Sequence, residues 1–299
     1  MDINYAINGE NLSKNFKEFK LNIPSLKVPE GFATALIGEN GAGKTTLLNM
    51  LSGIRLDYKG NIKYFDKYSD DDRENNPIVK ERIGYTGTGN YYFPKWTIKD
   101  IEEISKILFK DFSSEEFHKC CEELAISSNG SHKKISELSD GTKTKLMLAG
   151  IMARKTNLLI LDEPASPLDP LMREKLCEII GNYINDGNGK NSVLFSTHNI
   201  SDMESITDYA IIMEHGQIVE EGFVEELKEK YILVKGDKGD IEEAKKVLYT
   251  INTNPYGFEG ICLSENIDKL IGMNIVKEIP SLFQISVAVM KNSTKLVIR

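Results

Sequence analysis

The chain has 299 residues, of which 40% are hydrophobic and 27% charged, and its formal net charge is −8. This composition is typical of a globular protein with one large domain and a smaller one, or with two domains. No stretch approaches the roughly 20 apolar residues of a membrane-spanning helix, and the N-terminus does not resemble a signal peptide. The acidic balance without a basic block argues against nucleic acid as a partner. We therefore expect a cytoplasmic protein that reaches a membrane only through another protein.

The cysteines predict neither a zinc site nor a disulfide framework. No two of them form a C-x-x-C pair, and no histidine stands at metal-ligand spacing from any of them. We expect reduced, mostly buried thiols at Cys120, Cys121, Cys177 and Cys262.

The first third of the chain alternates between strand and helix patterns. Residues 3–28 predict two short strands, and residues 33–37 a compact apolar strand. A helix with its leucines on one face follows and ends at Gly53, since glycine often closes a helix. The polar stretch 57–80 favours a solvated loop or the start of a helix, and residues 82–85 favour a short strand.

The middle of the chain predicts helices followed by buried strands. Residues 97 to about 153 have a helical period, with a capped helix start at Ser113. The apolar runs 158–161, 192–196 and 210–213 predict strands, the first two buried on both faces. Alternating strands and helices indicate an α/β fold with a parallel or mixed sheet.

A turn-like, motif-free region begins near residue 230. We expect a first domain over residues 1–229 and a small α+β accessory domain over residues 230–299. The first domain carries every motif described below.

A glycine-rich segment between a strand and a helix fits the phosphate-loop pattern G-x-x-x-x-G-K-[ST]. Glycines let the backbone wrap a phosphate, and the helix N-terminus favours an anion. Lys44 is expected to reach the β- and γ-phosphates of ATP, and the Thr45 hydroxyl to join a Mg²⁺ shell. The alternative, a structural glycine turn, does not explain the flanking elements. The expected nucleotide-binding residues here are Gly38, Glu39, Asn40, Gly41, Ala42, Gly43, Lys44, Thr45 and Thr46.

Two adjacent acids, Asp162 and Glu163, follow a buried strand. Burying them is costly unless a cation meets them, so we expect Asp162 to hold Mg²⁺ and Glu163 to polarise an attacking water. The alternative is a turn with exposed acids. His198 follows another strand, at the edge where α/β sheets bind ligands, which favours a functional over a structural role.

In this order the motifs resemble the ATP-binding subunit of an ABC transporter, over roughly residues 5–228. Leu138-Ser139-Asp140-Gly141-Thr142 resembles the signature segment, usually Leu-Ser-Gly-Gly-Gln. Asp169 matches the loop that crosses between subunits. Phe16 matches the aromatic residue that stacks on adenine, and His198 the switch histidine that contacts the γ-phosphate.

The resemblance implies a P-loop NTPase core with a helical subdomain at about residues 97–153. It also implies that two subunits face head to tail, with Ser139 and Gly141 completing the ATP site of the other subunit. The partners would be a second copy or a paralogous ATPase subunit, and a separate transmembrane permease. The protein would then be peripheral at the inner face of the cell membrane.

The sequence departs from the family pattern at two places. Asp140 and Thr142 replace a glycine and the glutamine of the signature, and Asp140 adds negative charge near the partner's triphosphate. After residues 83–85 the family usually has a glutamine that touches Mg²⁺ or water, whereas here the shorter Thr88 stands nearest. Residues 91–96 are aromatic and are our candidate for gripping a membrane helix, with a buried aromatic corner as the alternative.

Residues 231–299 weakly resemble the C-terminal extension of ATPases that work with ABC-2-type permeases, among them peptide and antibiotic exporters. The leading hypothesis is therefore a transport ATPase for export. One alternative is a soluble ABC-type ATPase acting on ribosomes or DNA. The other is a regulatory ATP-binding protein with weak turnover.

Overall fold

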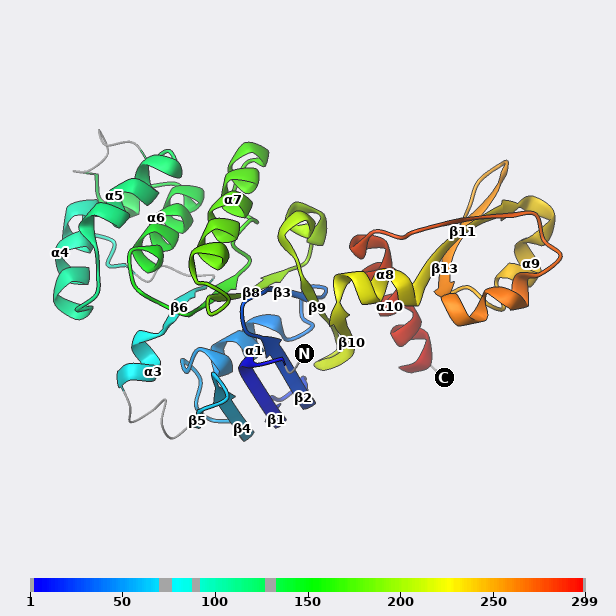
Figure 1. Cartoon of the computed structure of the whole chain (residues 1–299), viewed down its shortest axis with the longest axis horizontal. Helices are drawn as coiled ribbons and strands as arrows, with labels where there is room; N and C mark the ends of the chain where they lie inside the picture. Colours follow the sequence, from blue (N-terminus) through cyan, green and yellow to red (C-terminus); the bar gives the residue numbers. More distant parts are fainter. Residues whose placement is uncertain (1–2, 70–76, 88–91, 127–132, 298–299) are drawn as a thin grey trace.

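The computed structural model describes residues 3–69, 77–87, 92–126 and 133–297. Its larger part is built on a six-stranded sheet in the order β10-β9-β3-β8-β7-β6 (Figure 1). β10 is antiparallel to β9 and every other neighbouring pair is parallel, so the expected mixed sheet is confirmed. The strands are β3 (Ala33–Ile37), β6 (Ile83–Thr86), β7 (Leu158–Asp162), β8 (Ser192–Thr197), β9 (Tyr209–Glu214) and β10 (Gln217–Phe223).

The two faces of this sheet are covered differently. Alternate residues of a buried strand point to opposite faces, and Leu158 and Ile160 of β7 belong to one core while Leu159 and Leu161 belong to the other. The first core includes α1 and a second, antiparallel sheet in the order β2-β1-β4-β5. The second core includes the helices α5 (Ser114–Glu123), α6 (Asp140–Met152) and α7. The elements added here are β1 (Tyr5–Asn15), β2 (Lys20–Pro29), β4 (Lys59–Tyr64), β5 (Tyr68–Ser69), α1 (Lys44–Leu51) and α7 (Pro170–Asp186).

The expectation of a solvated loop or helix start is wrong for residues 59–69, which form β4 and β5. Only Ile62 and Tyr64 of β4 are buried, at 1% and 0% exposure. Two alternating apolar residues give a weak local signal, and pairing with β1, where Ile7 lies opposite Tyr64, decides the structure. Residues 70–76 lie outside the described part, and the short helix α3 (Pro77–Glu81) follows them.

The helical period after residue 97 corresponds to three helices. Thr97 and Asp100 cap the first reciprocally, and the Ser113 hydroxyl accepts a hydrogen bond from the Glu116 amide, so the capped start is confirmed. Ile101 of the first helix is buried, whereas Leu108 is 66% exposed. The helices are α4 (Ile98–Leu108), α5 (Ser114–Glu123) and α6 (Asp140–Met152).

The smaller part is an antiparallel sheet in the order β12-β13-β11-β14, reached through α8 (Figure 1). Its α+β character is as expected. The last helix, α10, packs on both parts: it contacts β12 and β13 of this sheet as well as β9 of the larger one, and its residues Leu282, Ile285 and Ala288 are buried in the core that contains α7. A domain boundary at residue 229 therefore stays a prediction. The elements are α8 (Val224–Lys230), β11 (Tyr231–Asp237), α9 (Ile241–Ala244), β12 (Thr250–Thr253), β13 (Gly257–Leu263), β14 (Ile275–Glu278) and α10 (Leu282–Val297).

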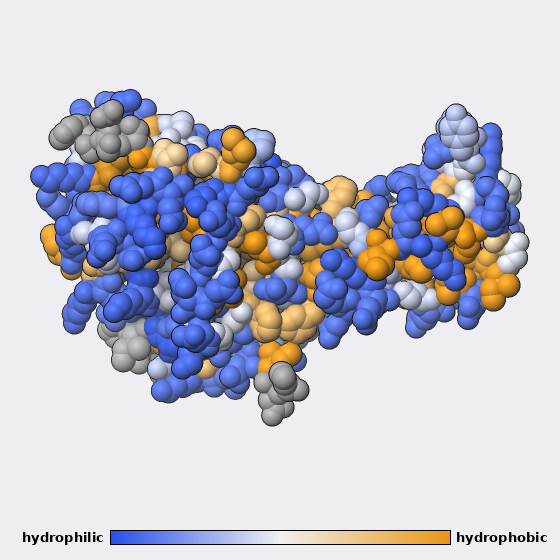
Figure 2. Space-filling model, turned by 45° about the horizontal axis from the view of Figure 1, so that its top comes forward, coloured by the Kyte–Doolittle hydropathy of each residue, from blue (hydrophilic) through white to orange (hydrophobic). Residues whose placement is uncertain are grey.

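Most of the surface of the larger part in Figure 2 is hydrophilic, while apolar residues gather on the smaller part. Ile271 and Ile279 of the smaller part are 79% and 78% exposed. No helix within the described ranges is long and apolar enough to cross a bilayer. All four cysteines are free thiols and three are buried, and burial raises the pKa of Cys120 to about 11.

Replacing Ile285 on α10 by alanine is expected to destabilise the larger part. Ile285 is fully buried, and truncating such a residue costs about 2–5 kcal/mol of unfolding free energy. The single tryptophan, Trp96, packs against the same core, so urea unfolding followed by its fluorescence measures the change. Ile279→Ala, at an exposed site just before α10, should shift the free energy by at most about 0.5 kcal/mol. Equal midpoints for the two variants would show that α10 does not stabilise this core.

Candidate functional site

The motif residues meet at one edge of the central sheet. In the parallel register, Ile37 of β3 pairs with Thr197 of β8, and Asp162 of β7 pairs with Ser196 of β8. The loops that follow β3, β7 and β8 therefore leave the sheet side by side at its carboxyl edge. α/β sheets bind ligands at this edge.

The phosphate loop needs glycine at two positions for different reasons. A Cβ on Gly38 would lie 2.6 Å from the Met213 carbonyl oxygen, because the loop begins against the end of β9. Gly43 caps α1 with φ +105°, and a Cβ there would lie 2.7 Å from the Phe19 ring. Side chains at these two positions would displace the loop, so the sequence pattern has a steric cause.

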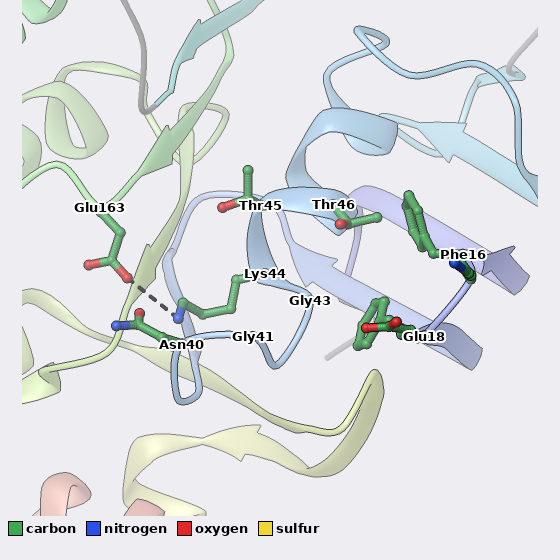
Figure 3. Close-up of a pocket in the computed structure, with 11 residues that line it drawn as sticks. Phe16, Glu18, Asn40, Gly41, Gly43, Lys44, Thr45, Thr46 and Glu163 are labelled. Carbon is green, nitrogen blue, oxygen red and sulfur yellow. Dashed lines mark ion pairs between the residues drawn. The ribbon is translucent and has the colours of Figure 1, made fainter.

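Lys44 ties the loop together and connects it to the acidic strand end. Its side chain is buried, and its Nζ donates hydrogen bonds to the carbonyl oxygens of Gly38 at 2.8 Å and Glu39 at 3.3 Å. The same Nζ lies 3.4 Å from Glu163 Oε1, the ion pair that is drawn dashed in Figure 3. The ammonium group is thus held at the mouth of the loop, in front of the N-terminus of α1.

The first pocket at this edge has a volume of about 780 Å³. Glu163 stands at one end and Phe16 at the other, with the phosphate loop between them (Figure 3). Glu18 and Phe19 also line it, although the motifs had not indicated them. The expected site residues that it brings together are Phe16, Asn40, Gly41, Gly43, Lys44, Thr45, Thr46 and Glu163.

Ser196 organises the acidic pair, and its role was not predicted from the sequence. Its hydroxyl donates to Asp162 Oδ1 at 2.5 Å and accepts from the Glu163 amide at 2.9 Å. Glu163 has φ +51°, a left-handed conformation that costs a non-glycine residue about 1–3 kcal/mol. The only sequence signal for Ser196 was a hydroxyl residue at a strand end near another strand's acid.

The Glu163 carboxylate has a partner at each oxygen. Oε2 lies 2.8 Å from His198 Nδ1, and Oε1 faces Lys44. The side chain is 16% exposed, whereas that of His198 is 44% exposed. The Glu163 carboxylate therefore lies in the wall between the two pockets, beside the Lys44 ammonium group and the His198 imidazole.

The second pocket, of about 540 Å³, adjoins the first and shares Asn40 and Glu163 with it. Asp162 lines it and is 4% exposed, and its Oδ2 has no hydrogen-bond partner within the described residues. A buried, unpaired carboxylate oxygen is the donor that Mg²⁺ or one of its water ligands requires, so the residues fit this ion. Thr45 lines the adjoining pocket, and Thr88 lies outside the described residues.

The signature segment forms the start of α6. The Ser139 hydroxyl accepts a hydrogen bond from the Thr142 amide at 3.2 Å and lies 2.8 Å from the Thr142 hydroxyl. A Cβ on Gly141 would lie 2.8 Å from the Pro167 carbonyl oxygen. Asp140 is 90% exposed, and its Oδ1 lies 3.0 Å from Lys143 Nζ. A neighbouring cation therefore meets the additional negative charge of this segment.

Some expected site residues line neither pocket. Asp169 caps α7 by accepting a hydrogen bond from the Met172 amide at 3.1 Å. The others belong to the back of the phosphate loop or to the signature segment. The full set is Gly38, Glu39, Ala42, Ser139, Gly141 and Asp169.

The aromatic segment after β6 is partly packed against α6 and partly exposed, and its contact with a membrane helix stays a prediction. Tyr92 and Trp96 help to line a groove of about 360 Å³ between α4 and α6. Tyr92 packs so closely on α6 that a Cβ on Gly150 would lie 2.7 Å from its hydroxyl. Phe93 points outward, 66% exposed, with its ring centroid 5.1 Å from that of Trp96. Tyr91 lies outside the described residues.

Comparisons with known proteins agree with this geometry. The family model described as ABC transporter matches residues 21–166. The uncharacterized ABC transporter ATP-binding protein YxlF of Bacillus subtilis (strain 168) is 32% identical over 225 residues, which cover 74% of this chain and 72% of that protein. The uncharacterized ABC transporter ATP-binding protein all4389 of Nostoc sp. is 30% identical over 250 residues, covering 82% and 72%.

Solved structures show the same fold. The dimeric bacterial ABC transporter cassette MJ0796 superposes with a TM-score of 0.63 at 20% identity, covering 73% of this chain and 98% of that one. The structure of cbiO1 from Clostridium perfringens, described as part of the ABC transporter complex cbiONQ, superposes with a TM-score of 0.59 at 23% identity, covering 75% and 90%. The chain therefore belongs to the ATP-binding proteins of the ABC transporter family, and it is an ATPase that uses ATP together with Mg²⁺.

Proposed function

We propose that this chain is the ATP-hydrolysing subunit of an export-type ABC transporter, with ATP held between two head-to-tail subunits. ATPases of this family act as dimers with transmembrane permease components. The observation that carries the hydrolytic part of the proposal is the position of Glu163 between Lys44 and His198, in the wall that the two pockets share.

The first pocket binds the nucleotide in this proposal. Backbone amides of residues 38–45 and the N-terminus of α1 receive the phosphates, and Lys44 contacts the β- and γ-phosphates. Phe16, at the far end of the pocket, stacks on the adenine ring. Thr45 and Asp162 would hold Mg²⁺, which would neutralise phosphate charge when bound.

Hydrolysis uses the acid and the imidazole. Glu163 orients a water molecule towards the γ-phosphorus and accepts its proton. The bond between the γ-phosphorus and the bridging oxygen breaks, so that ADP and phosphate leave. His198 contacts the γ-phosphate. Ser196 supports this step because it fixes the backbone amide of Glu163 and the carboxylate of Asp162.

The second subunit completes the site. The role of Ser139, Gly141 and Asp169 across the dimer is proposed from the resemblance of their segments to those of the family, and Asp140 and Pro167 of the same segments line the second pocket beside Glu163. The pairing of Lys143 with Asp140 reduces the repulsion that the acidic signature would cause at the partner's triphosphate.

The groove between α4 and α6 is our candidate for docking a permease helix at the inner face of the membrane. Tyr92, Trp96 and Leu108 line it, and Leu108 and the nearby Phe93 are each 66% exposed. Burying such apolar surface favours association with an amphipathic helix.

Export is proposed because residues 231–299 resemble the extension of ATPases that work with ABC-2-type permeases. Relatives of this chain also include import proteins, among them the tungstate uptake system ATP-binding protein TupC of Peptoclostridium acidaminophilum, 30% identical over 208 residues that cover 68% of this chain and 92% of that protein. Transport into inside-out vesicles that carry the chain and its permease would support export, whereas accumulation in right-side-out vesicles would contradict it.

Purification of the tagged full chain from detergent-solubilised membranes tests the transporter assignment. We expect a multi-span membrane protein to copurify at a fixed ratio. Recovery with ribosomes or DNA alone would instead support a soluble ABC-type ATPase.

A regulatory protein with weak turnover is a second candidate, favoured by Asp140 and Thr142 in the signature segment. Phosphate release by the isolated chain, and by the chain with its permease, distinguishes the two. Turnover stimulated by the permease supports the transport ATPase, and turnover that stays at the background level supports the regulator.

A further inference from the structure

Two cations, Lys14 and Arg55, lie near the ring of Phe16, and one carboxylate, Asp57, bridges them. None of the three lines the first pocket. Lys14 Nζ lies 5.7 Å and Arg55 Cζ 5.3 Å from the ring centroid. The Asp57 carboxylate joins these two cations: Oδ1 accepts a hydrogen bond from Arg55 Nη1 at 3.2 Å, and Oδ2 accepts a short one from Lys14 Nζ. The hydrogen bond from Lys14 lowers the pKa of the Asp57 carboxyl.

These side chains connect two segments that are distant in the sequence. Lys14 lies near the end of β1, whereas Arg55 and Asp57 follow the helix α1. The Arg55 amide donates to the Asn49 carbonyl oxygen at 2.8 Å, which fixes this segment to the last turn of α1. Because α1 begins at Lys44, the three charged residues link the segment that carries Phe16 to the helix that follows the phosphate loop.

The loop that carries Phe16 does not hold the ring by itself. Residues 16–19 connect β1 to β2, and the Phe16 amide donates to the Phe19 carbonyl oxygen at 2.8 Å. This bond fixes the turn of the backbone but leaves the Phe16 side chain 39% exposed, with its ring centroid 6.0 Å from that of Phe19. Lys14 and Arg55 add two cation–π contacts to this partly exposed ring.

We propose that Lys14, Arg55 and Asp57 position the Phe16 ring for stacking on the nucleobase and so determine how much the base contributes to nucleotide affinity. The inference rests on the proposed binding of ATP in the first pocket. A ring that is already oriented loses less freedom when the base stacks on it. The three residues are positioning residues, since none of them lines the pocket.

The test compares a ligand with a base and one without. For the full chain, Kd is measured by calorimetry for ATP and for inorganic tripolyphosphate. Arg55→Ala and Asp57→Asn are each expected to raise Kd for ATP about two- to fivefold and to leave Kd for tripolyphosphate unchanged. In steady-state assays KM for ATP rises while kcat stays the same. Lys175→Ala, which removes an ion pair with Glu178 on α7, is the matched control and changes neither constant.

A double-mutant cycle separates positioning from general destabilisation. In the Phe16→Ala background, Arg55→Ala should have no further effect on Kd for ATP, because the ring through which it acts is gone. The inference is overturned if Arg55→Ala raises Kd for tripolyphosphate as much as Kd for ATP, or leaves both Kd values unchanged. It is also overturned if Arg55→Ala keeps its full effect on Kd for ATP in the Phe16→Ala background. A wild-type chain that binds neither ligand would refute the proposed function itself, and that result differs from all of these.

Discussion

Glu163→Gln is expected to lower ATP turnover by about 10²–10⁴-fold, the usual contribution of a general base, and to leave ATP affinity intact. Glutamine has the size of glutamate and can still contact His198, but it cannot accept a proton from water. The loop contacts of Lys44 with the carbonyl oxygens of Gly38 and Glu39 do not depend on the carboxylate. Phosphate release measures the turnover, and calorimetry measures the affinity.

The same variant should accumulate as an ATP-bound dimer, because the step that reopens the dimer follows hydrolysis. Light scattering with ATP and Mg²⁺ is expected to give twice the monomer mass for Glu163→Gln. Glu225→Gln, at a side chain 85% exposed on α8, is the matched control and keeps wild-type turnover. Turnover within about threefold of the wild type would exclude Glu163 as the base, and a monomer in the presence of ATP would contradict the head-to-tail dimer of the isolated chain.

The central residues of the site could be predicted because their signals are local. The spacing of glycines and lysine in residues 38–45 follows from steric limits on one loop, and Asp162 and Glu163 stand directly after an apolar run. His198 required one more step, the expectation that parallel strands end at a common edge. The register of β3, β7 and β8 brings these segments together as that expectation requires.

Other features could not be predicted because they depend on contacts between distant segments. Ser196 matters through the pairing of β8 with β7, which places its hydroxyl against Asp162. Asp57 gains its partners only because the segment after α1 lies beside β1. The packing of α10 on the larger part could not be predicted either, because its apolar face does not reveal in the sequence which core it joins. The structure places Ile285 in the core that contains α7.

Lys44→Ala is expected to weaken ATP binding about tenfold to a hundredfold, in contrast to Glu163→Gln. The variant loses a charged hydrogen-bond donor to phosphate, worth about 1.5–3 kcal/mol, and each 1.4 kcal/mol is a factor of ten in Kd. It also loses the bonds to the carbonyl oxygens of Gly38 and Glu39 that hold the loop closed. Calorimetry gives Kd directly, and the rise in melting temperature on adding ATP should shrink accordingly.

Two comparisons show whether this loss comes from the phosphate loop. Lys44→Ala should weaken the binding of inorganic tripolyphosphate as strongly as the binding of ATP, because Lys44 contacts the phosphates whereas Phe16 contacts the base. Lys175→Ala, which removes a cation from α7 outside both pockets, should change Kd for neither ligand. An unchanged Kd for tripolyphosphate in Lys44→Ala would mean that the ammonium group serves only to bridge the loop and Glu163, and the assignment of residues 38–45 as the phosphate site would then be wrong.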